Sequence, residues 1–236
     1  MSKNTNIYEI SYSLKQERRR FIRNAALFVI SFFIVMNAIL AFVICPIQQR
    51  SASMEPNIPS GTCVFATPIG KKIKRGEIIV IAQREAKLSF KQKAMDALAG
   101  AFTFQKFRPW SDENPMMRRA VALPGDTIYM KDFILYIQPK NERHFFTEFE
   151  LNQISYSVDI TVPPAGWAPE IGARGSFDKI TLGDDEYYVL GDNRLSCVDS
   201  RLFGKIKGPK IRKRVLMSYY PFSRLKVFFA TKQAQK

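Results

Sequence analysis

The chain has 236 residues and a formal net charge of +15, with 46% hydrophobic and 24% charged residues. This composition is ordinary for a folded protein and excludes a disordered chain, and the length allows one large domain or two small ones. The charge predicts an anionic partner. Because none of the usual nucleic-acid-binding motifs occurs, we expect membrane lipid and no nucleic acid.

The N-terminal region is typical of a membrane anchor. Residues 1–20 are polar and end in three arginines, and the 21 residues from 25 to 45 carry no charge. At about 1.5 Å per residue, a helix of that length spans roughly 30 Å, the thickness of the hydrocarbon layer. We therefore predict a transmembrane helix at residues 21–45, since the apolar core of a cleavable secretory signal is shorter.

The charge distribution predicts the orientation of this helix. Positive charge is concentrated before the apolar run, and such charge stays on the cytoplasmic side. We expect residues 1–20 to form a cytoplasmic basic segment. The chain is then a single-pass protein of the cytoplasmic (inner) membrane, with the bulk of its residues on the outer side.

The segment 51–56 begins six residues after the apolar run ends, so it lies close to the membrane surface. Serines two residues apart in an extended segment point to the same face of the chain. One serine of the pair Ser51 and Ser53 can attack a carbonyl group while the other donates a hydrogen bond to the oxygen that becomes negative. A plain loop rich in serine and proline is the alternative.

After Pro46, apolar runs bounded by glycine, proline and basic residues predict a β-rich domain. We expect strands at residues 62–66, 77–82, 118–123, 127–130, 133–137 and 186–190. Residues 138–185 are less regular and rich in proline and glycine, which indicates an inserted cap subdomain. The main β core, in which the residues 51–56 lie, then comprises residues 46–137 and 186–236.

Residues 87–107 combine apolar side chains at helical spacing with lysines, and Ser89 suits the N-cap of a helix. Such a helix either lies on the membrane surface or packs on the β domain, and the sequence leaves both placements open.

A dense polar run of both charge signs, residues 191–194 and 199–201, follows the predicted strand at 186–190. This pattern indicates either a hydrogen-bonded loop at a functional site or a well-paired surface turn.

The three cysteines lie far apart, at positions 45, 63 and 197, and follow no CxxC spacing. This spacing argues against a disulfide framework and a metal site, so we expect no metal and no cofactor. A single bridge between Cys63 and Cys197 remains open on an oxidising side of the membrane.

Four sequence blocks follow the anchor in an order that indicates a family. They are residues 51–56, similar to S-x-S-M-x-P; 74–80, similar to R-G-D and a hydrophobic strand; 118–126, similar to K-R-hydrophobic-hydrophobic-G-L-P-G-D; and 191–204, similar to G-D-N-R-x-x-S-x-D-S-R-x-x-G. With these blocks, the chain resembles bacterial type I signal peptidases, the membrane-bound serine peptidases that cleave leader peptides from exported proteins.

The resemblance implies a mainly β fold, in which an N-terminal transmembrane helix precedes a β-rich catalytic core with an inserted β subdomain. The substrates it implies are the signal peptides of preproteins. Such a peptide would add as an extended strand at a sheet edge, so that main-chain bonds give affinity and small pockets give specificity.

The resemblance also implies roles for individual residues. Ser53 matches the nucleophile, and Ser51 matches the hydroxyl that stabilises the oxyanion together with the Ser53 backbone N–H. The residues that match those near the shallow pockets for small side chains are Met54, Ile58 and Met117. The residues that match the supporting positions of the last block are Asp199, Ser200 and Arg201.

Two positions depart from the family at the general base. Arg118 occupies the position of the base, a lysine, and Cys197 that of the serine that helps to orient this lysine. Arginine has a reference pKa of about 12.5–13.8, against about 10.4 for lysine, so it stays charged and is a poor proton acceptor. At this position it can still orient the site, stabilise the oxyanion or pair with Asp199.

The lesser departures are Arg50, where a proline is common, and Ala122, where the family has glycine. Some relatives use histidine as the base. The only histidine here, His144, falls in the inserted region, where we expect a surface or packing role.

Three functions therefore remain open. The first is a working signal peptidase whose base is supplied in an unusual way. The second is a catalytically weak or inactive homologue that binds leader peptides, and the third is a membrane-anchored interaction module unrelated to them. The oligomeric state does not follow from the sequence.

Overall fold

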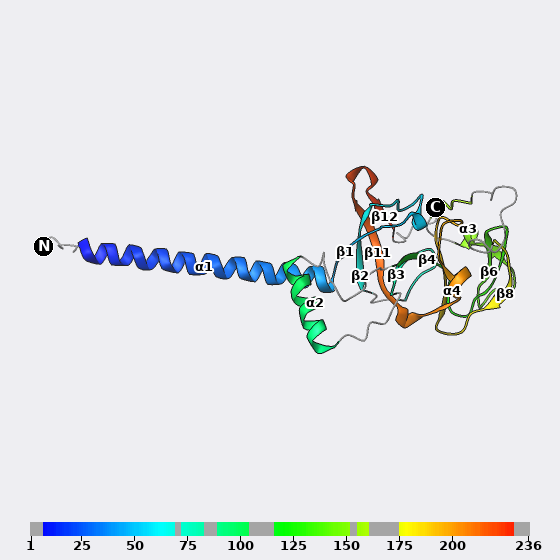
Figure 1. Cartoon of the computed structure of the whole chain (residues 1–236), viewed down its shortest axis with the longest axis horizontal. Coiled ribbons are helices and arrows are strands. Elements are labelled where there is room, and N and C mark those ends of the chain that lie inside the picture. Colours follow the sequence, from blue (N-terminus) through cyan, green and yellow to red (C-terminus); the bar gives the residue numbers. More distant parts are fainter. Residues whose placement is uncertain are drawn as a thin grey trace.

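The computed structural model describes residues 7–68, 72–82, 89–103, 116–151, 155–160 and 175–228. A long N-terminal helix, α1, projects from a domain of two β-sheets (Figure 1). The remaining helices and 3₁₀ turns are short, apart from α2, which lies beside the domain end of α1. Their bounds are α2 Phe90–Phe102, α3 Glu148–Leu151, α4 Ser200–Phe203, η1 Ala52–Met54, η2 Gly208–Lys210 and η3 Phe222–Arg224.

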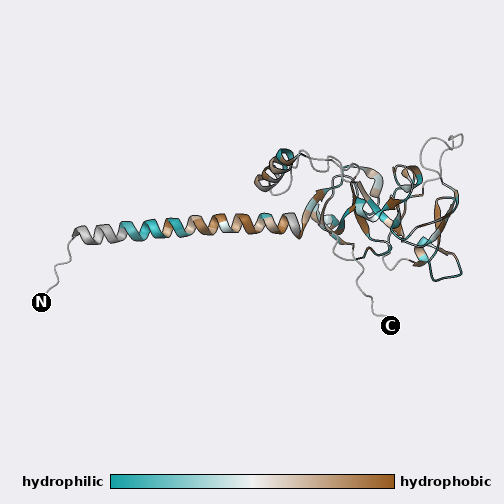
Figure 2. Cartoon of the chain, turned by 90° about the horizontal axis from the view of Figure 1, so that it is seen from below, coloured by the Kyte–Doolittle hydropathy of each residue, from teal (hydrophilic) through white to brown (hydrophobic). Residues whose placement is uncertain are grey.

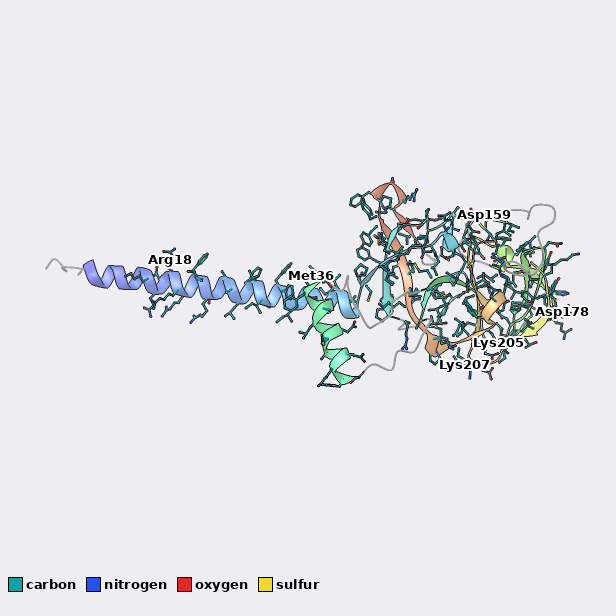
Figure 3. All side chains as sticks on the ribbon, in the orientation of Figure 1. Arg18, Met36, Asp159, Asp178, Lys205 and Lys207 are labelled. Atoms are coloured by element: carbon teal, nitrogen blue, oxygen red, sulfur yellow. The ribbon has the colours of Figure 1, made fainter. Side chains whose placement is uncertain are left out.

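Helix α1 runs from Ile7 to Phe42 and contains a candidate membrane span within Lys15–Leu40, whose most apolar 18 residues have a mean hydropathy of 1.9. By length and composition this stretch could cross a membrane. Figure 2 shows the hydrophilic part of α1 giving way to the hydrophobic part toward the domain. In Figure 3, Arg18 lies in the half remote from the domain and Met36 in the half next to it.

Both ends of α1 differ from the sequence expectation. The helix already begins at Ile7, within the basic segment, because the long charged side chains there are good helix formers. It ends at Phe42 rather than at residue 45. Cys45 starts strand β1 and is buried, and Pro46 next to it disfavours helical geometry at the preceding residue.

The larger sheet has eight strands, and each pairs with its neighbours in antiparallel fashion. Its order is β1-β2-β11-β3-β4-β9-β10, with β12 paired to β11. The bounds are β1 Cys45–Gln48, β2 Cys63–Pro68, β3 Ile78–Ile81, β4 Met116–Ala122, β9 Glu186–Leu190, β10 Ile206–Lys207, β11 Ile211–Tyr220 and β12 Lys226–Val227. The strands predicted at 62–66, 77–82, 118–123 and 186–190 are confirmed within a few residues.

Strand β11 was not predicted from the sequence, although this ten-residue strand lies between β2 and β3 in the middle of the sheet. Its first half carries the basic run Arg212, Lys213 and Arg214, which masks the apolar pattern. Of these, Arg214 is partly buried, and its charge is compensated because Nη1 donates to Glu77 Oε1 at 3.0 Å.

The second sheet has the order β7-β6-β5-β8. Its bounds are β5 Thr127–Lys131, β6 Ile134–Gln138, β7 Phe146–Thr147 and β8 Phe177–Thr181. We expected the β5–β6 hairpin in the core and the inserted subdomain to begin at residue 138. The hairpin instead pairs with β7 and β8, because local apolar patterning specifies a strand but not the sheet that it joins.

The two sheets share a hydrophobic core. Buried residues of β5 and β6, such as Ile128 and Leu135, pack in one cluster with Val121 of β4 and Leu190 of β9. Strands β4 and β9 therefore connect the second sheet to the part of the larger sheet that carries the polar loop after β9.

Helix α2 confirms the helix predicted at 87–107, of which residues 87, 88 and 104–107 lie outside the described chain. The Ser89 backbone N–H donates to Gln92 Oε1 at 3.0 Å, so the predicted N-cap is present. The ring of Phe102 lies 6.4 Å from that of Phe33 on α1. The exposed apolar residues of α2 are Phe90 (85%), Met95 (55%), Leu98 (59%) and Phe102 (75%).

Candidate active site

The two serines lie where the chain leaves β1 and forms the turn η1. Ser51 has an extended backbone (φ −124°, ψ 159°) and is exposed, whereas Ser53 lies in η1 and is only 3% exposed. Their hydroxyl oxygens are 3.0 Å apart, within hydrogen-bond distance. The two hydroxyls face each other as the sequence predicted, but the predicted extended segment is wrong, because Ser53 lies in a 3₁₀ turn.

Gln49 lies beside both serines and was not predicted from the sequence. We call Gln49, Ser51, Ser53 and Arg118 the Ser53 cluster. Its side chain is 3% exposed, and Nε2 lies 2.8 Å from the Ser51 carbonyl oxygen and 3.2 Å from Ser51 Oγ. Ser53 Oγ is 3.4 Å from the same nitrogen. Alternation along an extended strand could not have predicted this contact, because residues 52–54 form a 3₁₀ turn.

Arg118 reaches the same hydroxyl from β4. Its Nη1 donates to Ser53 Oγ at 2.9 Å and also to the Met117 carbonyl oxygen. Nε and Nη2 both donate to the Val198 carbonyl oxygen, at 2.9 and 2.7 Å. The side chain is 5% exposed, so a buried guanidinium closes the site on the side of the polar loop.

The acceptors of Arg118 are neutral. No carboxylate within the described ranges lies within ion-pair distance of it, and Asp199, which we considered as its partner, pairs with Arg201 instead. Arg201 Nε and Nη2 donate to the two carboxylate oxygens of Asp199 at 2.9 and 2.8 Å. A buried cation held only by neutral acceptors attracts any negative charge that develops beside it.

The loop after β9 packs directly against the serine turn. The backbone N–H of Asn193 donates to the Ser53 carbonyl oxygen at 3.2 Å, and that of Gly191 donates to Asp199 Oδ2 at 3.1 Å. A Cβ atom on Gly191 would lie 2.7 Å from the Ser53 carbonyl oxygen and would also collide with Cys197 Sγ. Glycine is therefore required here, because the Ser53 carbonyl oxygen and the Cys197 side chain occupy the space that a Cβ atom would need.

Asp199 and Ser200 hold the loop together from within. Asp199 Oδ1 accepts from the Arg201 backbone N–H at 3.0 Å and caps α4. Ser200 Oγ accepts from the Val189 backbone N–H at 3.0 Å. Both side chains, together with Arg201, are at least nine-tenths buried and do not contact Ser53 through a hydrogen bond.

Buried ion pairs attach this loop to the rest of the domain. Arg119 donates to both carboxylate oxygens of Asp192, at 2.8 and 2.6 Å, and Arg194 Nη2 lies 2.6 Å from Glu148 Oε2 in α3. Tyr156 lies between the two pairs, with its hydroxyl 2.7 Å from Glu148 Oε2 and its ring 3.9 Å from the Arg119 guanidinium carbon. Burial and the Glu148 carboxylate raise the pKa of Tyr156 well above its usual value, so its hydroxyl remains a donor.

Cys197 is buried behind the serine turn. Burial and the nearby Asp199 carboxylate raise the pKa of its thiol to about 12, although Arg118 and Arg201 act in the opposite direction. The thiol is therefore neutral at pH 7 and is not a proton acceptor in place of lysine. Cys63 and Cys197 are both reduced thiols, so the bridge left open by the sequence is not formed.

The residues matched to the substrate pockets lie in the hydrophobic core below the serine turn. The exposed fractions of Met54, Ile58 and Met117 are 0%, 0% and 1%. Their side chains support η1 from beneath and offer no open surface in this structure.

His144 is exposed in the second sheet's β6–β7 connection and makes no hydrogen bond to a described residue of the Ser53 cluster. Among the residues that the structure describes, no group of three or more His, Cys, Asp and Glu side chains is placed to hold a metal ion.

Comparison with known proteins shows the family of this chain. The model of the family "Signal peptidase, peptidase S26" matches residues 22–220. The chain is 24% identical to signal peptidase I of Bacillus licheniformis, over 80% of this chain and 83% of that protein. It is 22% identical to signal peptidase IB of Staphylococcus aureus (strain MRSA252), over 84% and 88% of the two chains.

A crystal structure of a signal peptidase I from Enterococcus faecalis is 22% identical, covers 60% of this chain and 94% of its own, and has a TM-score of 0.29. The family match extends from the apolar part of α1 to the end of β11 and contains every residue of the Ser53 cluster. The chain therefore belongs to the signal peptidase family, peptidase S26, as a serine protease of the signal peptidase I type.

Proposed function

We propose that this protein removes signal peptides from exported preproteins, with Ser53 as the nucleophile. The observation that carries the proposal is the position of Ser53 Oγ, 3.0 Å from Ser51 Oγ and 2.9 Å from Arg118 Nη1. A second hydroxyl and a cation at one serine oxygen are the groups that stabilise a serine nucleophile and the oxyanion that it creates.

Ser53 Oγ attacks the carbonyl carbon of the scissile bond and forms an acyl-enzyme, and the amine of the mature protein departs. Ser51 donates a hydrogen bond to the carbonyl oxygen as it becomes negative. Arg118 stabilises negative charge on Ser53 Oγ while the Ser53 proton passes to solvent water, because an arginine does not take that proton itself, and the departing amine takes up a proton from water. Water then hydrolyses the acyl-enzyme and regenerates Ser53.

The partners in this proposal are the signal peptide and membrane lipid. Helix α1 supports the second partner, because its Lys15–Leu40 stretch is long and apolar and only 6% of its most apolar window is buried. We place the N-terminus in the cytoplasm and the β domain on the outer side of the cytoplasmic membrane, since the basic residues precede the apolar ones in α1.

Incubation of the purified full-length chain with a preprotein, in detergent or lipid, tests the proposal. We expect release of the mature protein, with loss of turnover in Ser53→Ala because no other hydroxyl occupies the nucleophile position. Ser51→Ala should reduce turnover by roughly 10- to 1,000-fold, the scale of one oxyanion donor.

Circular dichroism and thermal unfolding of both variants provide the control that the fold is retained. Turnover by Ser53→Ala equal to that of the unaltered chain would show that another group is the nucleophile.

One observation favours a second candidate, a homologue that binds leader peptides with little or no cleavage. Arg118 only donates at Ser53, and the neutral acceptor that a lysine would provide is missing from that side among the described residues. The same incubation separates the candidates, because binding of a leader peptide without release of mature protein supports the second.

A further inference from the structure

Gln49 is a buried polar residue at the candidate active site that no motif of the family blocks covers. Its Nε2 faces the Ser51 carbonyl oxygen at 2.8 Å and the hydroxyl oxygens of Ser51 and Ser53 at 3.2 and 3.4 Å. A backbone carbonyl only accepts, so the amide presents its donor side to both serines. One amide proton is donated to the Ser51 carbonyl oxygen, and the other is directed at the hydroxyl oxygens of Ser51 and Ser53.

The donors around Ser53 Oγ determine where its own proton points. Arg118 Nη1 donates to this oxygen at 2.9 Å, and Gln49 Nε2 approaches it at 3.4 Å. A hydroxyl has two acceptor lone pairs and one proton, so Ser53 still needs an acceptor for its O–H. Within the described segments, the side-chain acceptor at hydrogen-bond distance is Ser51 Oγ, at 3.0 Å.

The same argument sets the direction of the Ser51 hydroxyl. Its oxygen accepts from Ser53 and also faces Gln49 Nε2, so both of its lone pairs are directed at donors. The Ser51 proton then points away from these donors, and Ser51 is an exposed residue. A substrate carbonyl oxygen approaching from solvent would meet a hydroxyl that is already oriented to donate.

We infer that Gln49 is a positioning residue that orients Ser51 as the oxyanion donor and directs the Ser53 O–H toward Ser51. The inference rests on the proposed roles of Ser53 as nucleophile and Ser51 as oxyanion donor. It adds that a side chain without substrate contact preorganises both hydroxyls before the reaction begins.

Gln49→Leu tests the inference, because leucine keeps most of the buried volume and removes the donor. We expect kcat for preprotein cleavage to fall by about 3- to 10-fold, the scale of one neutral hydrogen bond, with KM unchanged. The matched control is Gln48→Leu. Gln48 is the exposed neighbour whose Nε2 reaches only the Gly61 carbonyl oxygen, at 3.5 Å, and its replacement should leave kcat unchanged.

A double-mutant cycle with Ser51→Ala separates positioning from a purely structural role. If Gln49 acts through the Ser51 hydroxyl, Gln49→Leu should cost nothing further once that hydroxyl is absent. An equal fold-loss in both backgrounds, or no loss in either, overturns the inference.

A peptide boronate with a small side chain next to boron provides a readout without peptide cleavage. Its boron forms a bond with Ser53 Oγ while the hydroxyl proton passes to water, and an oxygen on boron takes the oxyanion position. We expect Gln49→Leu to weaken boronate affinity by a factor similar to its effect on kcat, and only when Ser51 is present.

The boronate also keeps the two proposals distinguishable. Boronate binding without preprotein cleavage would reject the proposed function, and the dependence on Gln49 and Ser51 would still decide the inference. An unaltered chain that neither cleaves preprotein nor binds the boronate would overturn both.

Discussion

Arg118 is the residue whose chemistry most affects how Ser53 can react. It is buried, it donates to Ser53 Oγ at 2.9 Å, and its other acceptors are backbone carbonyl oxygens of Met117 and Val198. These contacts suit a group that stabilises an oxygen carrying negative charge. They do not suit a base, since a guanidinium stays protonated and has no lone pair to offer.

Replacing Arg118 with lysine should supply the missing acceptor. Lysine has a reference pKa of about 10.4, and burial at this position lowers it because the charged form loses solvation. We expect cleavage to appear or to rise several-fold, with a rate that increases toward alkaline pH as the lysine loses its proton. The measurement is a pH–rate profile of preprotein cleavage.

Two further variants sharpen this experiment. Cys197→Ser should increase the effect of Arg118→Lys, because it replaces a buried thiol with a hydroxyl that holds the lysine. Arg118→Met is the control of similar length without a base, and we expect no alkaline rise. Substantial cleavage by the unaltered chain that drops in both lysine variants would mean that arginine is part of a working site.

At the scale of secondary-structure elements, α2 is distinguished by what it leaves uncovered. Its apolar side chains Phe90, Leu98 and Phe102 are more than half exposed, and Phe102 lies beside Phe33 of α1. At about 1.5 Å per residue, Phe33 lies roughly 10 Å inside the end of the apolar stretch at Leu40. If α1 spans the bilayer, Phe102, which lies beside Phe33, is at the depth of the lipid.

We therefore predict that α2 inserts its apolar face into the outer part of the bilayer. In a background with Trp110 and Trp167 replaced by phenylalanine, the fluorescence of Phe102→Trp should be quenched by lipids brominated on their acyl chains. The same lipids should leave Phe149→Trp unquenched, because Phe149 is an exposed residue of helix α3, which follows β7 of the second sheet. Equal quenching of the two variants, or none at position 102, contradicts this placement.

The polar loop after β9 shows how elements far apart in sequence form one site. Buried pairs between Arg119 and Asp192, and between Arg194 and Glu148, join β4, the loop and α3. Removing one partner of such a pair leaves an uncompensated buried charge. These pairs therefore hold the loop against the turn that contains Ser53. The Asn193 backbone N–H donates to the Ser53 carbonyl oxygen across this contact.

At the scale of the whole molecule, the position of the site follows from the short connection between α1 and η1. Helix α1 ends at Phe42 and Ser53 lies in η1, so strand β1 is the only regular element between the apolar helix and the nucleophile. The β domain extends from this end of α1 (Figure 1). A helix that spans the membrane would thus hold Ser53 close to the membrane surface.

The proposed orientation predicts the side from which this domain can be digested. Protease added to intact spheroplasts should degrade the chain beyond residue 46 and leave an N-terminal epitope tag protected. Digestion of both parts after detergent lysis is the control for protease activity. Full protection of the β domain in intact spheroplasts would reverse the orientation.

The sequence by itself determined the features that depend on local patterns. The apolar run specified α1, and alternating or continuous apolar segments specified four strands of the larger sheet, β2, β3, β4 and β9, since burial periodicity is encoded residue by residue. The motif blocks also indicated Ser51, Ser53 and Arg118 as candidate site residues, because these residues lie within short segments of distinctive composition.

Only the tertiary structure decided how these segments meet. It placed the β5–β6 hairpin in the second sheet, gave Asp199 to Arg201 rather than to Arg118, and directed the Gln49 amide at both serines. Each of these outcomes depends on which groups become neighbours after the chain has folded. A buried polar or charged group pairs with the partner that lies within reach in the folded chain. The local sequence does not determine the distance between such partners.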